Sequence, residues 1–329
     1  MPSKSFIHVK QLSRYFHQLC AVDKLNFELR QGEILGFLGA NGAGKSTTLK
    51  MLCGALAPSE GEIMIRGVNL LTDPRQAKSH IGYLPERAPL YLDMKVDEYL
   101  LYCAELRQVK AKYRANAIKN AKTRCALNDV ATRLIGHLSK GYQQRVGIAQ
   151  AIVHDPSILI LDEPSAGLDP IQIHDIRRLI RSLGQDRSVL ISSHILPEVQ
   201  SVCDRVQIIH QGRLALSASI EDLQQRLRAH SLLLALRANA DIELISRTPG
   251  VTKIDKLESN RFRIHFEQQN PAEKLAQLAV ERGWGLQQLH PEQRSLEDIF
   301  LEITGKDSVV TEDTNPSLPR VDASAEDAS

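Results

Sequence analysis

Residues 34–46 read ILGFLGANGAGKS, and this stretch decides how the chain folds. Its second half fits the pattern G-x-x-x-x-G-K-[ST], which starts at Gly39 and ends at Lys45 and Ser46. The apolar run 34–38 predicts a strand, and a helix is expected to begin near Lys45. Between strand and helix, glycines let backbone N–H groups turn toward phosphate oxygens, and the helix N-terminus adds positive dipole. The pattern predicts a phosphate-binding loop, with Lys45 on the β- and γ-phosphates and Ser46 on Mg²⁺. The alternative is a plain glycine-rich turn.

An acidic element follows much further along the chain. Residues 158–163 read ILILDE, an apolar run that ends in two carboxylates. A strand that is apolar on both faces is typical of a buried parallel sheet, and its C-terminal end lies where open α/β sheets bind ligands. We expect Asp162 to hold Mg²⁺, mostly through water, and Glu163 to polarise an attacking water. Such a strand end is common alone, but beside a phosphate-binding loop it predicts a hydrolytic site.

Residues 138–145, LSKGYQQR, identify a family. The segment resembles the LSGGQ signature motif of ATP-binding cassette (ABC) ATPases, although Lys140 and Tyr142 replace the usual Gly and Gln. The order phosphate-binding loop, signature, acidic strand is also that of the family. The resemblance implies that Ser139 and Gly141 cap the γ-phosphate held by a second copy of the chain. For this segment alone, an ordinary helix N-terminus is the alternative.

Other positions also resemble the family. Residues 165–169, SAGLD, match the D-loop, and His194, after the predicted strand 188–193, matches the switch histidine that senses the γ-phosphate. A structural histidine is the alternative there. Tyr15 matches the aromatic residue that stacks on adenine, with Phe16 as a competing candidate and a core position as the alternative for either.

Glu86 departs from the usual pattern, because most of the family has Gln at this position of the Q-loop. Its carboxylate can still contact Mg²⁺ or a water on it, but an ionised carboxylate cannot donate a hydrogen bond. The surrounding segment GYLPERAPLYLDMKVDEYL (82–100) resembles gliding-motility-associated and other ABC-2-type exporter ATPases. The segment SLEDIFLEITG (295–305) resembles the end of the accessory domain in that branch. The resemblance covers about residues 5–305.

The resemblance implies three overlapping sets of site residues. The catalytic set is Glu163, His194 and Lys45. The set that binds ATP is Tyr15, Gly39, Ala40, Asn41, Gly42, Ala43, Gly44, Lys45, Ser46, Thr47, Glu86, Ser139 and Gly141. The set that binds Mg²⁺ is Ser46, Glu86 and Asp162.

Composition agrees with a protein of this kind. The 329 residues are 43% hydrophobic and carry a net charge of +2, which argues against a strongly basic nucleic-acid binder. No run approaches the roughly 18 apolar residues of a membrane span, and the N-terminal residues lack a signal peptide's apolar core, so we expect a cytoplasmic protein. The five cysteines show no metal-ligand spacing and are expected to be buried, reduced thiols.

The expected fold class is α/β. The resemblance implies a P-loop NTPase of the ABC ATPase type: a RecA-like core with antiparallel β and α-helical subdomains, followed by a small α+β accessory domain. We expect the cassette over 5–218, with its helical subdomain at about 88–145, the accessory domain over 219–305 and a disordered tail over 306–329. Within the cassette, helices are expected over 91–108, 113–127 and 171–183.

The accessory region is expected to begin with a helix capped at Ser219. A ferredoxin-like βαββαβ order follows, with Trp284 in its core. The predicted strands are 232–236, 251–257, 261–266 and 286–290, and the predicted helices are 241–248, 271–281 and a closing 295–304.

The function implied is that of an ATP-hydrolysing subunit of an ABC-2-type exporter, which acts as a dimer on a separate permease at the inner face of the membrane. No nucleic-acid partner is expected. The helical stretch 89–127 is predicted to dock the permease through exposed apolar residues among Leu90, Tyr91, Leu92, Met94 and Tyr99. The alternatives are a soluble ABC ATPase acting on ribosomes or DNA, and a P-loop small-molecule kinase, which leaves the signature and His194 unexplained.

Overall fold

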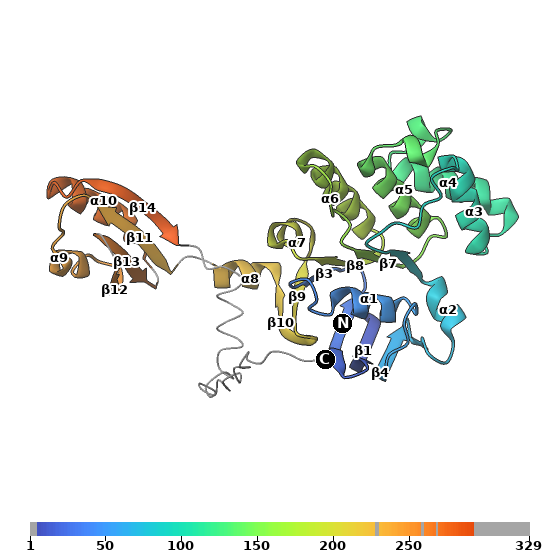
Figure 1. The fold of residues 1–329 in the computed structure, drawn as a ribbon, viewed down its shortest axis with the longest axis horizontal. Coiled ribbons are helices and arrows are strands. Elements are labelled where there is room, and N and C mark those ends of the chain that lie inside the picture. The colour runs from blue at the N-terminus through green and yellow to red at the C-terminus, as the bar shows by residue number, and fades with distance from the viewer. Residues whose placement is uncertain (1–4, 228–229, 258–259, 268, 293–329) are drawn as a thin grey trace, which may run out of the picture.

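A six-stranded sheet lies at the centre of the N-terminal domain (Figure 1). The computed structural model describes residues 5–227, 230–257, 260–267 and 269–292. The strand order is β10-β9-β3-β8-β7-β6, parallel from β9 to β6 and with β10 antiparallel at one edge. The strands are β3 (Ile34–Leu38), β6 (Ile81–Leu84), β7 (Ile158–Asp162), β8 (Ser188–Ser193), β9 (Arg205–His210) and β10 (Arg213–Ser219).

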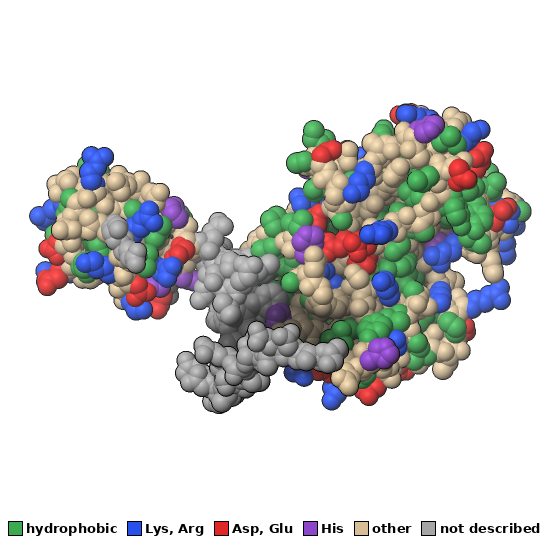
Figure 2. Space-filling view, in the orientation of Figure 1, with side chains coloured by type: hydrophobic (Ala, Val, Ile, Leu, Met, Phe, Trp, Pro, Cys, Tyr) green, Lys and Arg blue, Asp and Glu red, His purple; other side chains and the backbone are tan. Residues whose placement is uncertain are grey.

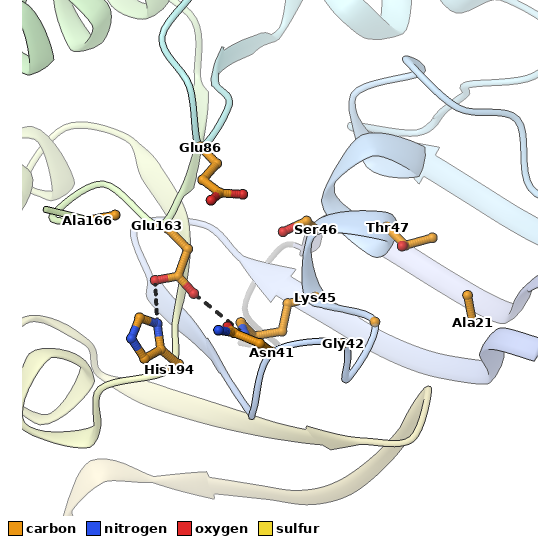
Figure 3. Close-up of a pocket in the computed structure, with 11 residues that line it drawn as sticks. Ala21, Asn41, Gly42, Lys45, Ser46, Thr47, Glu86, Glu163, Ala166 and His194 are labelled. Atoms are coloured by element: carbon orange, nitrogen blue, oxygen red, sulfur yellow. Dashed lines mark hydrogen bonds and ion pairs between the residues drawn. The ribbon is translucent and has the colours of Figure 1, made fainter.

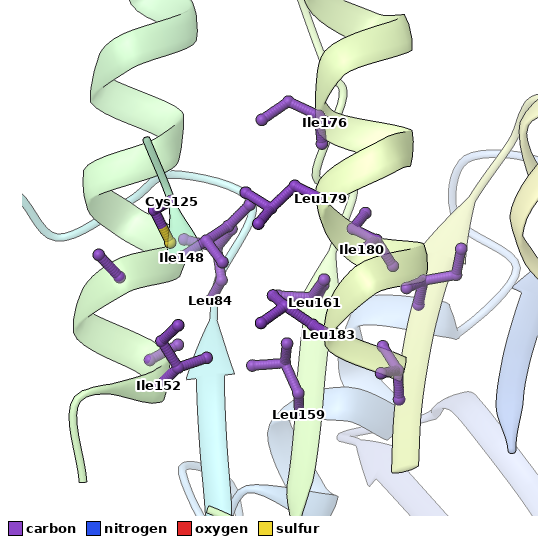
Figure 4. Close-up of a cluster of buried hydrophobic side chains, with 14 of the residues drawn as sticks. Leu84, Cys125, Ile148, Ile152, Leu159, Leu161, Ile176, Leu179, Ile180 and Leu183 are labelled. Atoms are coloured by element: carbon purple, nitrogen blue, oxygen red, sulfur yellow. The ribbon is translucent and has the colours of Figure 1, made fainter. Parts of the chain in front are cut away.

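Both faces of this sheet are covered, as its apolar strands predict. In β7, Leu159 and Leu161 point into one hydrophobic cluster, whereas Ile158 and Ile160 point into the other. The first cluster packs α5 (Lys140–Ile152) and α6 (Pro170–Gly184) against the sheet, and Figure 4 shows its side chains between these helices and β6 and β7. The double coverage explains why these strands show no polar alternation.

Leu159 is fully buried, and its truncation is expected to be costly. Leu159→Ala should lower the free energy of unfolding by about 2–5 kcal/mol, because it removes apolar contacts and leaves a cavity. Urea unfolding of the two proteins measures the difference. Ile171→Ala is the matched control, since Ile171 is 79% exposed. An equal, small loss for both variants would contradict this picture of the core.

A second, antiparallel sheet covers the other face, in the order β2-β1-β4-β5. Its strands are β1 (Ser5–Phe16), β2 (Leu19–Arg30), β4 (Glu60–Ile65) and β5 (Val68–Asn69). Helix α1 (Lys45–Leu52) contributes Leu49, Met51 and Leu52 to the cluster shared by the two sheets. This packing fixes the position of the N-terminus of α1, which directly follows β3 and its loop.

The helical region contains α2 (Pro74–Ser79), α3 (Val96–Leu106), α4 (Ala111–Arg124), two 3-10 turns (Asn128–Val130, Ile135–His137) and α5. The prediction of a helix from residue 91 is wrong. Helix α3 begins after Lys95, whose backbone N–H donates to the Glu98 carboxylate at 3.0 Å and so caps the helix there. The exposure predicted for Tyr99 is also wrong: Tyr99 is 2% exposed, and its hydroxyl donates to the Pro89 carbonyl at 2.8 Å.

Three further helices follow along the chain: α6 lies between β7 and β8, α7 (Leu196–Val202) between β8 and β9, and α8 (Ile220–Leu227) after β10. Ser219 caps α8 as predicted, since its hydroxyl accepts from the Asp222 N–H at 3.0 Å. The cysteine prediction is confirmed in part. All five thiols are free, and Cys103, Cys125 and Cys203 are buried, but Cys53 is half-buried and Cys20 is exposed near the turn between β1 and β2.

The C-terminal region has the predicted βαββαβ order. Its elements are β11 (Ser231–Leu236), α9 (Ile242–Ser246), β12 (Val251–Lys256), β13 (Arg261–Phe266), α10 (Ala272–Glu281) and β14 (Leu286–Glu292). The antiparallel sheet runs β12-β13-β11-β14, and Trp284, 8% exposed, belongs to a separate core as predicted. The predicted helix 295–304 and the tail 306–329 lie outside the described residues.

Candidate active site

The loop between β3 and α1 is shaped by its glycines. Gly44 has φ +103°, and a Cβ there would lie 2.6 Å from the Ala21 carbonyl oxygen. Only glycine combines that left-handed backbone with so close an approach. Lys45 is the first residue of α1, so the backbone N–H groups at the start of the helix face the loop. The sequence prediction of strand, loop and helix is therefore confirmed.

Lys45 reaches back across this loop and is 5% exposed. Its ammonium donates to the Gly39 carbonyl at 2.8 Å and lies 3.5 Å from Oε1 of Glu163. A buried ammonium is costly unless it is paired or hydrogen-bonded. The Lys45–Glu163 pair joins the phosphate-binding loop to the end of β7, 118 residues further along the chain.

Asp162, the last residue of β7, is almost fully buried. Its Oδ1 accepts from the Ser46 hydroxyl at 3.0 Å and from the Ser192 hydroxyl at 2.6 Å. The Ser192 hydroxyl also accepts the Glu163 N–H at 2.9 Å, so one hydroxyl contacts both the Asp162 carboxylate and the Glu163 backbone. Ser192 was not predicted from the sequence, although the two serines that end the apolar strand β8 were a signal for it.

Glu163 has φ +47°, in the left-handed region that non-glycine residues rarely adopt. Its Oε2 lies 3.0 Å from Nδ1 of His194, and Oε1 faces Lys45. Because an ionised carboxylate only accepts, Nδ1 carries the proton and donates to it. Strained backbone of this kind is found where a side chain is aimed at a functional position.

A cavity of about 320 Å³ lies at these residues, and Figure 3 shows Glu86 drawn above Glu163, with its carboxylate pointing toward the side of Ser46. The lining brings together many of the predicted residues: Asn41, Gly42, Gly44, Lys45, Ser46, Thr47, Glu86, Glu163 and His194. Ala166, from the segment matched to the D-loop, also lines it, as does Ala21, which was not predicted. Gly39, Ala40, Ala43 and Asp162 lie behind this lining in the loop and at the strand end. The cavity thus offers one buried cation, two acids and a histidine to a ligand.

Tyr15 and Phe16 lie close to this cavity without lining it. Tyr15 pairs with Cys20 across β1 and β2, next to Ala21 of the cavity wall, and is 38% exposed. Phe16 is 40% exposed and lies under the guanidinium of Arg14, 4.7 Å from its ring centre. Both aromatic rings therefore remain candidates for stacking on a base.

The signature segment does not join the cavity of its own chain. Ser139 is exposed and caps α5 by accepting the Tyr142 N–H at 3.5 Å, and Gly141 follows in the first turn. The turn is tied to the segment after Glu163, because Gln144 donates to the Pro164 carbonyl at 2.8 Å. Lys140 packs over Gly167: a Cβ added at Gly167 would lie 2.1 Å from the Lys140 ammonium.

Comparison with known proteins gives the family. The ABC transporter family matches residues 22–166, and the C-terminal domain of DrrA1-3-like ATP-binding proteins matches residues 219–304. The bacitracin transport ATP-binding protein BcrA of Bacillus licheniformis is 35% identical over 305 residues, which are 92% of this chain and 98% of that protein. The chain is an ABC transporter ATP-binding protein.

Other relatives of this ABC protein agree. The Bacillus subtilis ATP-binding protein NatA is 36% identical over 214 residues, covering 64% of this chain and 87% of its own. A solved ATP-binding subunit of an ABC transporter superposes with TM-score 0.61 at 29% identity, over 68% of this chain and 93% of that chain. A cassette solved as a dimer (22% identity, TM-score 0.59, 65% and 98% coverage) shares the fold.

This ABC protein therefore binds nucleotide and is an ATPase of the kind coupled to transport, as its sequence predicted. The family and fold predictions are confirmed, and the small-molecule kinase alternative is wrong. The alternative of a soluble ATPase acting on ribosomes or DNA is not favoured, because the relatives are named as transporter subunits. Among the described residues, no helix has both the length and the apolarity needed to cross a membrane.

Proposed function

We propose that this chain is the ATP-hydrolysing subunit of an ABC-2-type exporter and works as a dimer on a separate permease at the inner face of the cell membrane. The supporting observation is the extent of the match. Similarity to BcrA, which is named for bacitracin transport, covers 98% of that protein and so includes the accessory domain as well as the cassette. We place these two domains at 5–218 and 219–305, with the helical subdomain at about 88–145.

Mg²⁺ fits the donors present at the site. The Ser46 hydroxyl and the Asp162 carboxylate are hard oxygen donors that lie 3.0 Å apart, and the Glu86 carboxylate lines the same cavity. Mg²⁺ is commonly held by one or two such groups together with substrate phosphates and waters. When bound, it offsets charge on the β- and γ-phosphates.

In the proposed hydrolysis, water attacks the γ-phosphorus in line and the bond to the bridging oxygen of ADP breaks. Glu163 orients the water and accepts its proton. Lys45 and His194 face the same cavity and stabilise the negative charge that spreads over the phosphoryl oxygens. Tyr15, at the edge of the cavity, stacks on the adenine.

A second copy completes the site. Ser139 lies exposed at the N-terminus of α5, outside the cavity of its own chain, where the helix dipole favours an anion. We place Ser139 and Gly141 on the γ-phosphate bound by the other copy. The segment 163–169 is tied to this turn, because Gln144 donates to the Pro164 carbonyl.

Exposed apolar side chains form the first part of the proposed docking surface for the permease. Tyr91, Leu92, Tyr102 and Leu106 are 49%, 55%, 37% and 64% exposed. The rings of Tyr91 and Tyr102 lie 5.5 Å apart, and Tyr102 and Leu106 share one face of α3. Leu90 and Met94, also predicted for this surface, are only half-buried, so they can contribute.

A basic groove of about 870 Å³ continues this surface, with Leu106 in its wall. Figure 2 shows Lys and Arg side chains on both sides of the hollow between the α2 and α3 regions. The four cations that line the groove are Arg75, Lys78, Arg107 and Lys110, against one acid, Asp73. Burial lowers the pKa of His154, which also lines it, to about 4, so this ring adds no charge at neutral pH. We infer that the permease presents an apolar segment with an acidic flank.

Charge substitution tests this surface. Leu106→Glu combined with Lys110→Glu should abolish recovery of a multi-span membrane protein with the tagged chain from detergent-solubilised membranes. ATP binding should be unchanged, because both side chains are remote from the nucleotide cavity. Val280→Glu is the matched control, since Val280 is 74% exposed on α10.

Two results would contradict the proposal. If the double variant recovers the membrane protein at wild-type stoichiometry, the docking surface is elsewhere. If the wild-type chain is recovered with ribosomes or DNA and without a membrane protein, the exporter assignment itself is wrong and the soluble alternative is favoured.

A further inference from the structure

Glu198 is a buried acid that the proposed hydrolysis does not use. It lies in the first turn of α7, four residues after His194, and is 4% exposed. Among the described residues, its Oε1 has no hydrogen-bond partner, and the nearest cation is the Arg177 guanidinium at 3.9 Å. Burying a carboxylate with so little compensation is unfavourable. An apolar side chain would pack at this position without the cost of burying a carboxylate, so packing alone does not account for a glutamate here.

The other carboxylate oxygen connects Glu198 to the switch segment. Oε2 accepts from the Ser193 hydroxyl at 2.6 Å. The same hydroxyl accepts the Ile195 N–H at 3.0 Å, which closes a tight turn around His194. The two backbone units that flank His194 are therefore tied through one hydroxyl, and that hydroxyl is held by Glu198.

His194 needs such support because its own side chain is only loosely held. The ring is 45% exposed, and within the described part of the chain its side-chain hydrogen bond runs from Nδ1 to Glu163. A reacting group must be held close to its productive position, and a small misplacement can be costly in rate. Short hydrogen bonds between buried side chains can supply that constraint.

We propose that Glu198 is a positioning residue for His194: through Ser193 it fixes the turn that presents the imidazole to the γ-phosphate. This inference rests on the proposed role of His194 in hydrolysis. It predicts an effect on the chemical step and none on ATP affinity, because neither Glu198 nor Ser193 lines the nucleotide cavity.

A double-mutant cycle tests the proposal. Glu198→Ala and Ser193→Ala should each lower kcat about 10-fold, as expected for the loss of one charge-assisted hydrogen bond, with KM for ATP unchanged. Glu198→Gln should restore most of the rate, because the amide oxygen still accepts from Ser193. In a His194→Ala background, Glu198→Ala should change kcat less than about 2-fold, since there is no imidazole left to position.

The outcomes separate this inference from the function on which it rests. If His194→Ala retains wild-type kcat, the role of His194 is wrong. If His194→Ala lowers kcat but Glu198→Ala lowers it further by the same 10-fold, Glu198 acts on the fold and the inference is overturned. Full kcat in Ser193→Ala, a small change expected to fold normally, would also overturn it. Thermal melting of each variant identifies any loss caused by unfolding.

Discussion

Glu163→Gln should retain ATP binding and stop ATP turnover. The amide is the same size as the carboxylate, and its oxygen can still accept a hydrogen bond from His194 Nδ1, which lies 3.0 Å from Oε2 of Glu163 in the structure. It cannot accept a proton from water, so kcat is expected to fall about 10²–10⁴-fold, the contribution of a positioned general base. Because the ATP-bound state no longer turns over, the variant should accumulate as an ATP-bound dimer.

Measured hydrolysis and equilibrium nucleotide binding test this prediction together. Glu60→Gln is the matched control, since it makes the same change at an exposed position of β4 that does not line the cavity. It should keep its turnover. A Glu163→Gln protein that hydrolyses ATP at the wild-type rate would show that the base is another group.

Lys45→Ala should weaken ATP binding itself. The ammonium is 5% exposed and lies at the start of α1, where it can reach the β- and γ-phosphates. Loss of its charge-assisted hydrogen bonds should cost about 1.5–3 kcal/mol, which corresponds to affinity weaker by about 10- to 150-fold. Turnover should fall as well, because the same cation offsets charge in the transition state.

Lys50→Ala controls for the loss of a cation from the same helix, because Lys50 is exposed near the end of α1. Its ATP affinity should match the wild type in a titration with a fluorescent ATP analogue. Equal affinities for Lys45→Ala and the wild type would remove Lys45 from the phosphate site.

The centre of the site could be predicted because its parts are short and local. Gly44 and Lys45 sit in one loop, and Asp162 and Glu163 end one strand. That these two segments meet follows from the geometry of a parallel sheet, in which strand ends converge at one edge. The 3.5 Å approach of Lys45 to Glu163 is the result.

The features that were not predicted from the sequence depend on strand register and on tertiary contacts. Ser192 lies opposite Asp162 because β7 and β8 pair in one particular register, which a single sequence does not encode locally. Tyr99 has the apolar spacing of an exposed docking face, yet its ring is buried and its hydroxyl is bonded to Pro89. Ala21 lines the cavity only because β2 passes beside the phosphate-binding loop.

The most direct test of the account is the mass and nucleotide content of the Glu163→Gln protein with ATP, measured by sedimentation and by quantifying bound nucleotide. The account predicts a dimer that holds two ATP and returns to monomer with ADP, and no dimer when Ser139→Ala removes the contact across the interface. A protein that binds one ATP per chain and stays monomeric would contradict it.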